Sequence, residues 1–445
     1  MVFILGVKYR LRNYWSYPPI GQTFDEQLYA WVGSSLINTG VPTGWSFIPD
    51  YHITKSVQMN LDGYTTHMTL VTPFIEQPPL AGLLSALLSR SYRLASFGEV
   101  TLKQIRFPAI ILSSLSLLLL FIYTSRAYGS RIGLLTAVIF AFTPTIIISH
   151  RLATAENYLA FFLLLGLICL QQFIIGNQKK YLFFTVLLSI ICYLIKPFGL
   201  ILPFVFFLAI FVYNLPKIYL IWPVMSPAIS HLLFVAYGNF YDPALFSRLI
   251  SYQSSRLFSP LGGLLKIILP RITQLFLDGW IVFGWLSVFS LAIKSRLKTN
   301  FWIVAPVIGY LLLFTLYGGE DYGWYRLLLY PFLCASGASV LYSAFRQKSS
   351  VIPVLFIITV FASSFWWGLF TTPWSNINLL FRAIFIFFTV YFLLFPYFPK
   401  LKALYLPVSL LLFAGIIFLN IQTINHLQSI WQTLGNDSSL IPFRK

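Results

Sequence analysis

The sequence has little charge, and acidic charge is especially scarce. Only 9% of the 445 residues are charged, whereas roughly a quarter are in a soluble domain. Asp and Glu together number 12, against 30 Lys and Arg. With 58% hydrophobic residues and a mean hydropathy of +0.79, the composition excludes an ordinary soluble protein. We therefore predict an all-α fold, a polytopic bundle of transmembrane helices.

Cysteine is scarce too, and the common cofactor motifs are missing. Cys169, Cys192 and Cys334 each lie inside an apolar run, so they form no recognisable disulfide or metal framework. The sequence contains no credible P-loop, dinucleotide-binding glycine motif or nucleophile elbow, and we expect no nucleotide cofactor. The net charge of +18 comes from short basic clusters between apolar runs, which suit anionic lipid headgroups better than nucleic acid.

Long hydrophobic runs begin only at Phe107. A bilayer needs about 20 apolar residues per helix, and twelve runs approach that length. They lie at 107–124, 132–149, 155–175, 181–196, 199–215, 218–237, 280–293, 301–317, 327–344, 351–370, 378–396 and 403–421. Residues 1–8 are too few to span, and we interpret them as the remnant of a first, truncated transmembrane helix.

The remaining segments give the expected domain organisation. Residues 9–106 form a long external loop with interfacial helices, and 107–237 form transmembrane helices. Residues 238–279 form a second external loop, 280–421 the C-terminal transmembrane helices, and 422–445 a short external tail.

Lys and Arg cluster in alternate short turns, and the positive-inside rule places those turns in the cytoplasm. All 12 acids then fall on the opposite side, although the rule does not count them. We therefore expect the working face to be extracytoplasmic.

Asp25 and Glu26 form an adjacent acidic pair in the first loop. Thr23 and Glu26 fit a helix capping box, and Asp25 in a first helical turn would complement the helix dipole. A carboxylate held beside a helix start at the membrane surface is also well placed to accept a proton from an acceptor hydroxyl. The two interpretations are compatible if Glu26 caps and Asp25 faces the site.

Four further stretches carry charge on the same side. Glu76, in Glu-Gln-Pro-Pro-Leu, is either a cap substitute or the ligand of a divalent cation. Arg151 and Glu156 lie between two spans, where Arg151 is either an interface anchor or a phosphate ligand that Glu156 orients. Lys196 and Arg326 each lie at the external end of a predicted span, at a similar depth in the membrane.

The order of these features resembles the GT-C glycosyltransferases, in particular the protein O-mannosyltransferase and aminoarabinose transferase branches. The resemblance rests on the Asp-Glu pair at 25–26, on Glu-Gln-Pro-Pro-Leu at 76–80, on Arg151 five residues before an acid, and on Lys-Pro-Phe-Gly-Leu at 196–200. The family often has Asp where this chain has Glu156.

The resemblance implies a transferase in a bacterial or archaeal plasma membrane. It implies a polyprenyl-phosphate-sugar donor, and as acceptor a protein, a glycolipid or a cell-wall glycan. By the same resemblance, Asp25 and Glu26 are catalytic, Arg151, Glu156, Lys196 and Arg326 bind the donor phosphate, and Glu76 is associated with a metal. The alternative is a lipid or polysaccharide flippase, but its charges would be expected near the middle of the spans.

Overall fold

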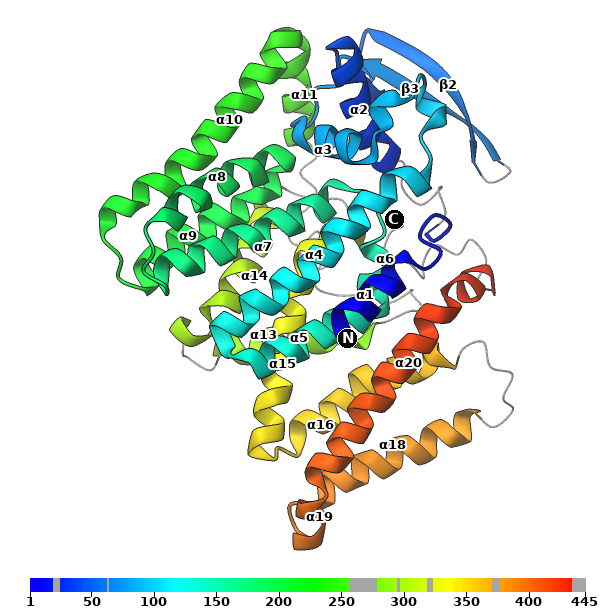
Figure 1. The fold of residues 1–445 in the computed structure, drawn as a ribbon, viewed down its shortest axis with the longest axis vertical. Helices are drawn as coiled ribbons and strands as arrows, with labels where there is room; N and C mark the ends of the chain where they lie inside the picture. The colour runs from blue at the N-terminus through cyan, green and yellow to red at the C-terminus, as the bar shows by residue number, and fades with distance from the viewer. Residues whose placement is uncertain are drawn as a thin grey trace.

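The structure, a computed structural model, describes residues 1–18, 25–61, 64–255, 278–293, 297–317, 323–369 and 377–433. Most of these residues are helical, and the long helices pack into one bundle with a small sheet at one end (Figure 1). The predicted all-α polytopic bundle is confirmed. Thr23, Glu320 and Asp321 lie outside the described residues, as do Asp62, Asp437 and most of the second loop.

The first loop folds over one end of the bundle. It follows α1 (Val2–Leu11) and contains α2 (Asp25–Thr39) and α3 (Leu80–Ser89), with short 3-10 turns η2 (Ser91–Arg93) and η3 (Phe97–Glu99). The helices α2 and α3 cross closely at Gly33 and Gly82. A Cβ added to Gly33 would lie 2.0 Å from the carbonyl oxygen of Gly82, so only glycine fits there.

This loop also holds a three-stranded antiparallel sheet that the sequence analysis did not predict. Its strands are β1 (Gly44–Trp45), β2 (Ile53–Leu61) and β3 (Tyr64–Thr72), in the order β1-β3-β2. Along β3, Met68 and Leu70 are buried and Thr69 between them is exposed, as the period of two in a strand requires. The buried side chains pack against Phe97.

The helices of the bundle coincide with all twelve predicted apolar runs. The first half contains α4 (Leu102–Tyr128), α5 (Ser130–Phe142), α6 (Pro144–Ser149), α7 (Ala155–Ile174), α8 (Lys180–Ile195), η4 (Pro197–Leu200), α9 (Ile201–Val212), η5 (Lys217–Leu220), α10 (Ile221–Tyr241) and α11 (Pro243–Ser255). Pro144 lies in the first turn of α6 and separates it from α5 within the second run, because a helix start needs no N–H from proline.

The second half contains α13 (Gly279–Ile293), α14 (Leu297–Tyr317), η6 (Gly323–Leu328), α15 (Tyr330–Gln347), α16 (Val351–Phe356), η7 (Ile357–Phe361), α17 (Ala362–Gly368), α18 (Ile377–Leu394), α19 (Pro399–Ala403) and α20 (Tyr405–Thr433). Among the described residues, six segments are long and apolar enough to cross a membrane. The protein is therefore an integral membrane protein.

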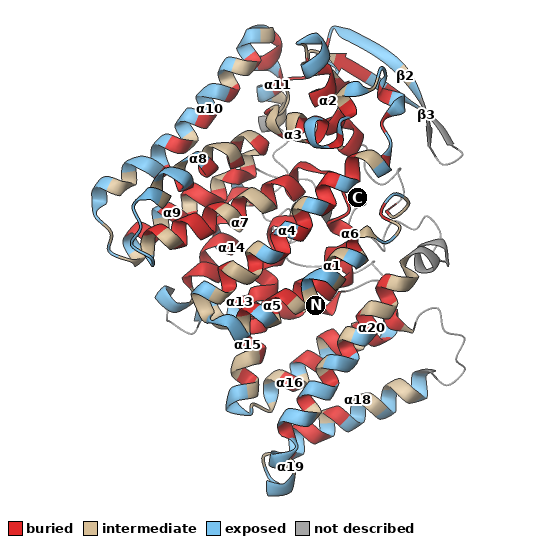
Figure 2. Cartoon of the chain, in the orientation of Figure 1, coloured by how far each residue is buried: buried red, intermediate tan, exposed pale blue. Residues whose placement is uncertain are grey.

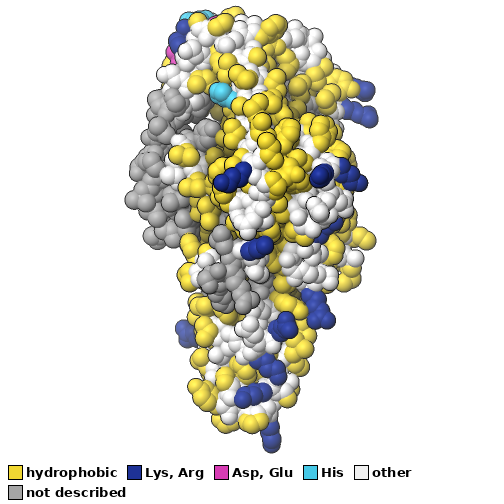
Figure 3. Space-filling view, turned by 90° about the vertical axis from the view of Figure 1, so that its left-hand side faces the viewer, with side chains coloured by type: hydrophobic (Ala, Val, Ile, Leu, Met, Phe, Trp, Pro, Cys, Tyr) yellow, Lys and Arg dark blue, Asp and Glu magenta, His cyan; other side chains and the backbone are white. Residues whose placement is uncertain are grey.

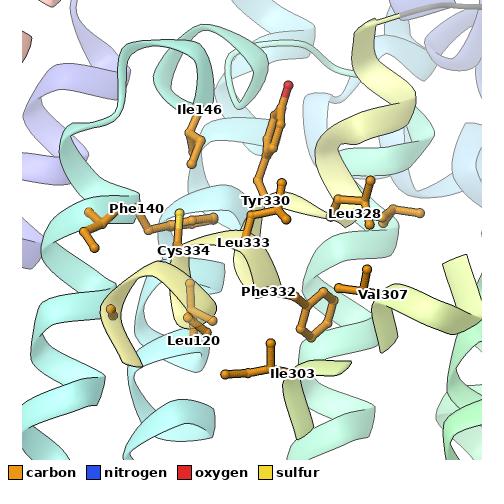
Figure 4. Packing of buried hydrophobic residues seen from close by; sticks show 14 of the residues in the cluster. Leu120, Phe140, Ile146, Ile303, Val307, Leu328, Tyr330, Phe332, Leu333 and Cys334 are labelled. Atoms are coloured by element: carbon orange, nitrogen blue, oxygen red, sulfur yellow. The ribbon is translucent and has the colours of Figure 1, made fainter. Parts of the chain in front are cut away.

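The core lies where α4, α5, α14 and α15 meet. Leu120, Phe140, Ile303 and Phe332 come from these four helices and are buried together (Figure 4). Figure 2 shows α7 mostly buried and α10 mostly exposed at the side of the bundle. Exposed side chains of α10 such as Leu232 and Val224 are apolar, as expected for a surface that faces lipid.

The described acids gather at the end of the bundle that the first loop covers. Hydrogen bonds join Glu26 to the starts of α4 and α7, Glu156 to the end of α8, and Asp278 to α6. Figure 3 agrees for one face: acidic atoms appear only near the top, while Lys and Arg extend down to the opposite tip.

Candidate active site

Glu26 is fully buried in a bidentate ion pair with Arg106. Its Oε1 accepts from Arg106 Nη2 at 2.6 Å, and its Oε2 accepts from Arg106 Nε at 2.8 Å. Oε2 also accepts from the backbone N–H of Ala153 at 2.8 Å, and Arg106 Nη1 donates to the carbonyls of Tyr14 and Pro18. Glu26 thus joins α2 to the start of α4 and to the α6–α7 turn.

Lys196 and Glu156 form a second ion pair, between the end of α8 and the first turn of α7. The Glu156 side chain is 1% exposed and the Lys196 side chain 12%. The ammonium also lies 4.3 Å from the centre of the Tyr325 ring, a cation–π distance. We expected Glu156 to orient Arg151, but its observed partner is Lys196.

Burial alone would lower the pKa of Lys196, but the hydrogen bond and charge of Glu156, together with the charges of Tyr29 and Asp25, outweigh burial and the pKa is raised. Lys196 is therefore a stable cation that still reaches the surface. Such a group can neutralise the charge that develops on a departing phosphate.

Asp25 lies in the first turn of α2. The negative charge of Asp25 acts on both Lys196 and Tyr29, which lies one helical turn further along α2. Tyr29 is buried, and burial raises the pKa of its phenol well above the usual value. The first turn of α2 therefore brings a half-buried carboxylate toward the Lys196–Glu156 pair.

The Glu76 loop adjoins the same group. The Tyr29 hydroxyl donates to Gln77 Oε1 at 2.9 Å, which ties this loop to α2. Glu76 itself accepts from Gln253 of α11 at 3.3 Å, and burial together with the Glu76 charge raises the pKa of Tyr51. Within the described part of the chain, no three His, Cys, Asp or Glu side chains come together as a metal site would require. The residues around Glu76 thus do not by themselves fit a protein-held cation.

Arg326 approaches the group from η6. This turn packs on α7, and Arg326 is 8% exposed. The Tyr310 hydroxyl donates to the carbonyl of Tyr325 at 2.7 Å. The charges of Glu156 and Arg326 both act on this hydroxyl. Arg326 and Glu156 are therefore both near Tyr310, and the role of Arg326 toward a donor phosphate stays a prediction.

Arg151 contacts α1. Its Nη2 donates to the carbonyl of Tyr9 at 2.8 Å, and next to it Arg10 Nη2 lies 3.2 Å from His150 Nδ1. Burial and the positive charges of Arg106, Arg10 and Arg12 lower the pKa of Arg151 to about 9. Arg151 thus belongs to a cluster of cations, and its role toward a phosphate remains a prediction.

Sequence reasoning missed several residues that hold this site together. Arg106, the partner of Glu26, stands directly before an apolar run, and an ionisable residue there should have prompted a search for its partner. Tyr29 follows Asp25 by four residues, and Tyr325 precedes Arg326, so helical spacing and adjacency were the available signals.

Part of the chain matches a known family model. Residues 76–237 match the family model of dolichyl-phosphate-mannose-protein mannosyltransferase, a segment that contains Glu76, Arg106, Arg151, Glu156 and Lys196. A search of curated proteins finds no match.

Among solved structures, the chain is similar to ArnT from Cupriavidus metallidurans bound to undecaprenyl phosphate. The TM-score is 0.57 at 14% identity, over 96% of this chain and 77% of that one. The apo form of ArnT gives 0.54 at 14% identity, over 91% and 72%. An oligosaccharyltransferase from Archaeoglobus fulgidus is more distant, at 0.47 and 13% identity, over 84% and 56%. The predicted resemblance to GT-C glycosyltransferases is confirmed, and the chain has their fold.

Proposed function

We propose that this protein is an inverting glycosyltransferase that moves a sugar from a polyprenyl-phosphate donor to an acceptor hydroxyl. The observation that carries the proposal is the nearly buried Lys196–Glu156 pair, at the end of the bundle covered by the loop whose helix α2 begins at Asp25. The mannosyltransferase family model and the undecaprenyl phosphate bound to ArnT support a lipid-linked donor.

The chemistry needs a base and a cation, and both are present. The acceptor oxygen forms a bond to the anomeric carbon as the bond from that carbon to the phosphate oxygen breaks. Asp25 takes the hydroxyl proton. The bond's electron pair leaves with the lipid phosphate, and Lys196 and Arg326 stabilise its charge. A single displacement of this kind inverts the anomeric centre.

The other predicted residues have supporting parts in this proposal. Arg151 adds positive charge on the phosphate side, while Glu156 holds Lys196 in its charged state. Glu26 holds the first turn of α2, and with it Asp25, against the bundle. We derive no step through a cation at Glu76, because no three His, Cys, Asp or Glu side chains come together among the described residues.

The acidic end of the bundle is proposed to face the extracytoplasmic side of a bacterial or archaeal plasma membrane. The donor sugar is a hexose or pentose, and the acceptor a protein, glycolipid or cell-wall glycan. The observation supporting this side is the gathering of the described acids opposite the basic turns.

The test uses purified protein, a synthetic polyprenyl-phosphate sugar and a panel of hydroxyl acceptors. We expect a glycosylated product whose anomeric configuration is opposite to that of the donor. Retention of configuration would contradict the single-displacement mechanism. Lipid scrambling in liposomes without transfer to any acceptor would contradict the enzyme and favour a flippase.

A further inference from the structure

A cleft of about 680 Å³ opens between α1 and α20, and neither Asp25 nor Lys196 lines it. Figure 1 shows α20 running past α1 at the side of the bundle. The Arg12 guanidinium hydrogen-bonds to the Asn425 amide oxygen, which links the two helices. The walls of the cleft are both apolar and basic, and are formed by Ile4, Val7, Lys8, Tyr9, Leu11, Arg12 and Asn425.

Along α1, an apolar side chain comes first and basic side chains follow. Lys8 and Arg12 are both exposed and four residues apart, so they project from one side of the helix. Ile4, which is 70% exposed, lies one turn before Lys8 on the same stripe. An apolar end and a basic end on one stripe match a lipid whose chain and headgroup lie in that order.

Positive charge at this cleft is not balanced by the protein. Within the described ranges, no carboxylate forms an ion pair with Lys8, Arg10, Arg12 or Arg151. Lys8 and Arg12 are the two cations that line the cleft. An anion bound between them would relieve their mutual repulsion.

We propose that the α1–α20 cleft is a binding site for an anionic phospholipid, with its phosphate between Lys8 and Arg12 and an acyl chain along Ile4, Val7 and Leu11. The site is separate from the donor phosphate site at Lys196. Clustered Lys and Arg at a membrane surface attract anionic headgroups in this way.

The test measures lipids retained by the full-length purified protein in native mass spectrometry, with phosphatidylglycerol and phosphatidylcholine supplied equally. We expect wild type to retain phosphatidylglycerol in preference to phosphatidylcholine. In Lys8→Gln/Arg12→Gln, the ratio of the two retained lipids should fall about tenfold. The control Lys400→Gln/Lys402→Gln removes two exposed cations from α19 and should keep it. Equal loss in both double variants would overturn the proposal.

Two further arms separate the headgroup charge from other causes. Asn425→Ala breaks the Arg12 link without removing a charge, and we expect it to retain phosphatidylglycerol as wild type does. Loss of retention in Asn425→Ala would make the helix link, and not the charge, responsible. Displacement of phosphatidylglycerol by undecaprenyl phosphate, dependent on Lys8 and Arg12, would assign the cleft to the donor and contradict a separate site.

Discussion

Glu26 and Arg106, 80 residues apart in sequence, meet in a bidentate pair from which solvent is fully excluded. The pair fixes the helix that carries Asp25 to the first long helix of the bundle. Removing one partner leaves a buried, uncompensated charge, which costs about 3–5 kcal/mol.

The first prediction concerns that pair. Arg106→Met leaves Glu26 charged and buried, and we expect it to lower the free energy of unfolding by about 3–5 kcal/mol. The measurement is denaturant or thermal unfolding in detergent. In a double-mutant cycle, Glu26→Gln/Arg106→Met should lose less than the sum of the single variants. Additive losses would mean that the two side chains do not stabilise each other.

The second prediction concerns the pH dependence of Lys196. Its folded-state pKa lies above the usual 10.5, so its charge stabilises the fold below that pH and the contribution is lost only as pH rises through the folded-state pKa. Glu156→Gln removes the nearest of the charges that raise this pKa and leaves the burial that lowers it. In the pH profile of kcat/KM, we expect the alkaline limb to shift to lower pH by roughly one pH unit or more.

The control for this shift is Glu99→Gln, which removes an exposed carboxylate that bonds only locally to Ala95 and Ser96. Its alkaline limb should match that of wild type. If Glu156→Gln also keeps the wild-type limb, Lys196 does not depend on Glu156 for its charge.

Much of the fold follows from the sequence, because a bilayer accepts only long apolar helices with internally bonded backbones. The twelve runs therefore predicted the helices of the bundle. The sheet at 44–72 was not predicted because β2 is mostly exposed and β3 alternates between buried and exposed side chains, so no long apolar run marks either nine-residue strand.

The charged residues of the site could be predicted from the sequence, but their ion-pair partners could not. The acids at 25 and 26 look equivalent in sequence, yet Glu26 is buried with Arg106 while Asp25 is half-buried toward Lys196. Glu156 is five residues from Arg151, but its partner Lys196 lies 40 residues away. Packing between helices that are distant in sequence determines these partners, so the spacing of residues along the chain does not predict them.

The third prediction concerns Arg151. If its guanidinium contacts the donor phosphate, Arg151→Met removes a charge-assisted hydrogen bond and should raise KM for the donor by about tenfold or more. Arg151→Lys, which keeps the charge, should lose less. The measurement is donor-dependent transfer at saturating acceptor. A lower melting temperature with an unchanged donor KM would instead make Arg151 a structural link to Tyr9.

The fourth prediction concerns orientation in the membrane. The native thiols of Cys169, Cys192 and Cys334 are buried and should not react in the folded protein. Cysteines placed at exposed Lys55 and exposed Lys179 then report opposite ends of the bundle. In intact cells, an impermeant maleimide should label Lys55→Cys and not Lys179→Cys. Labelling of both, or of Lys179→Cys alone, would contradict the proposed orientation.

The fifth prediction is the most direct test of the account, which assigns proton abstraction to Asp25. The measurement is transfer of radiolabelled sugar from a synthetic polyprenyl-phosphate donor by purified wild type, Asp25→Asn and the Glu99→Gln control. We predict that Asp25→Asn lowers kcat by about 10²–10⁴-fold without changing the melting temperature, while Glu99→Gln transfers like wild type. Equal transfer by wild type and Asp25→Asn would show that Asp25 is not the base and would contradict the proposed mechanism.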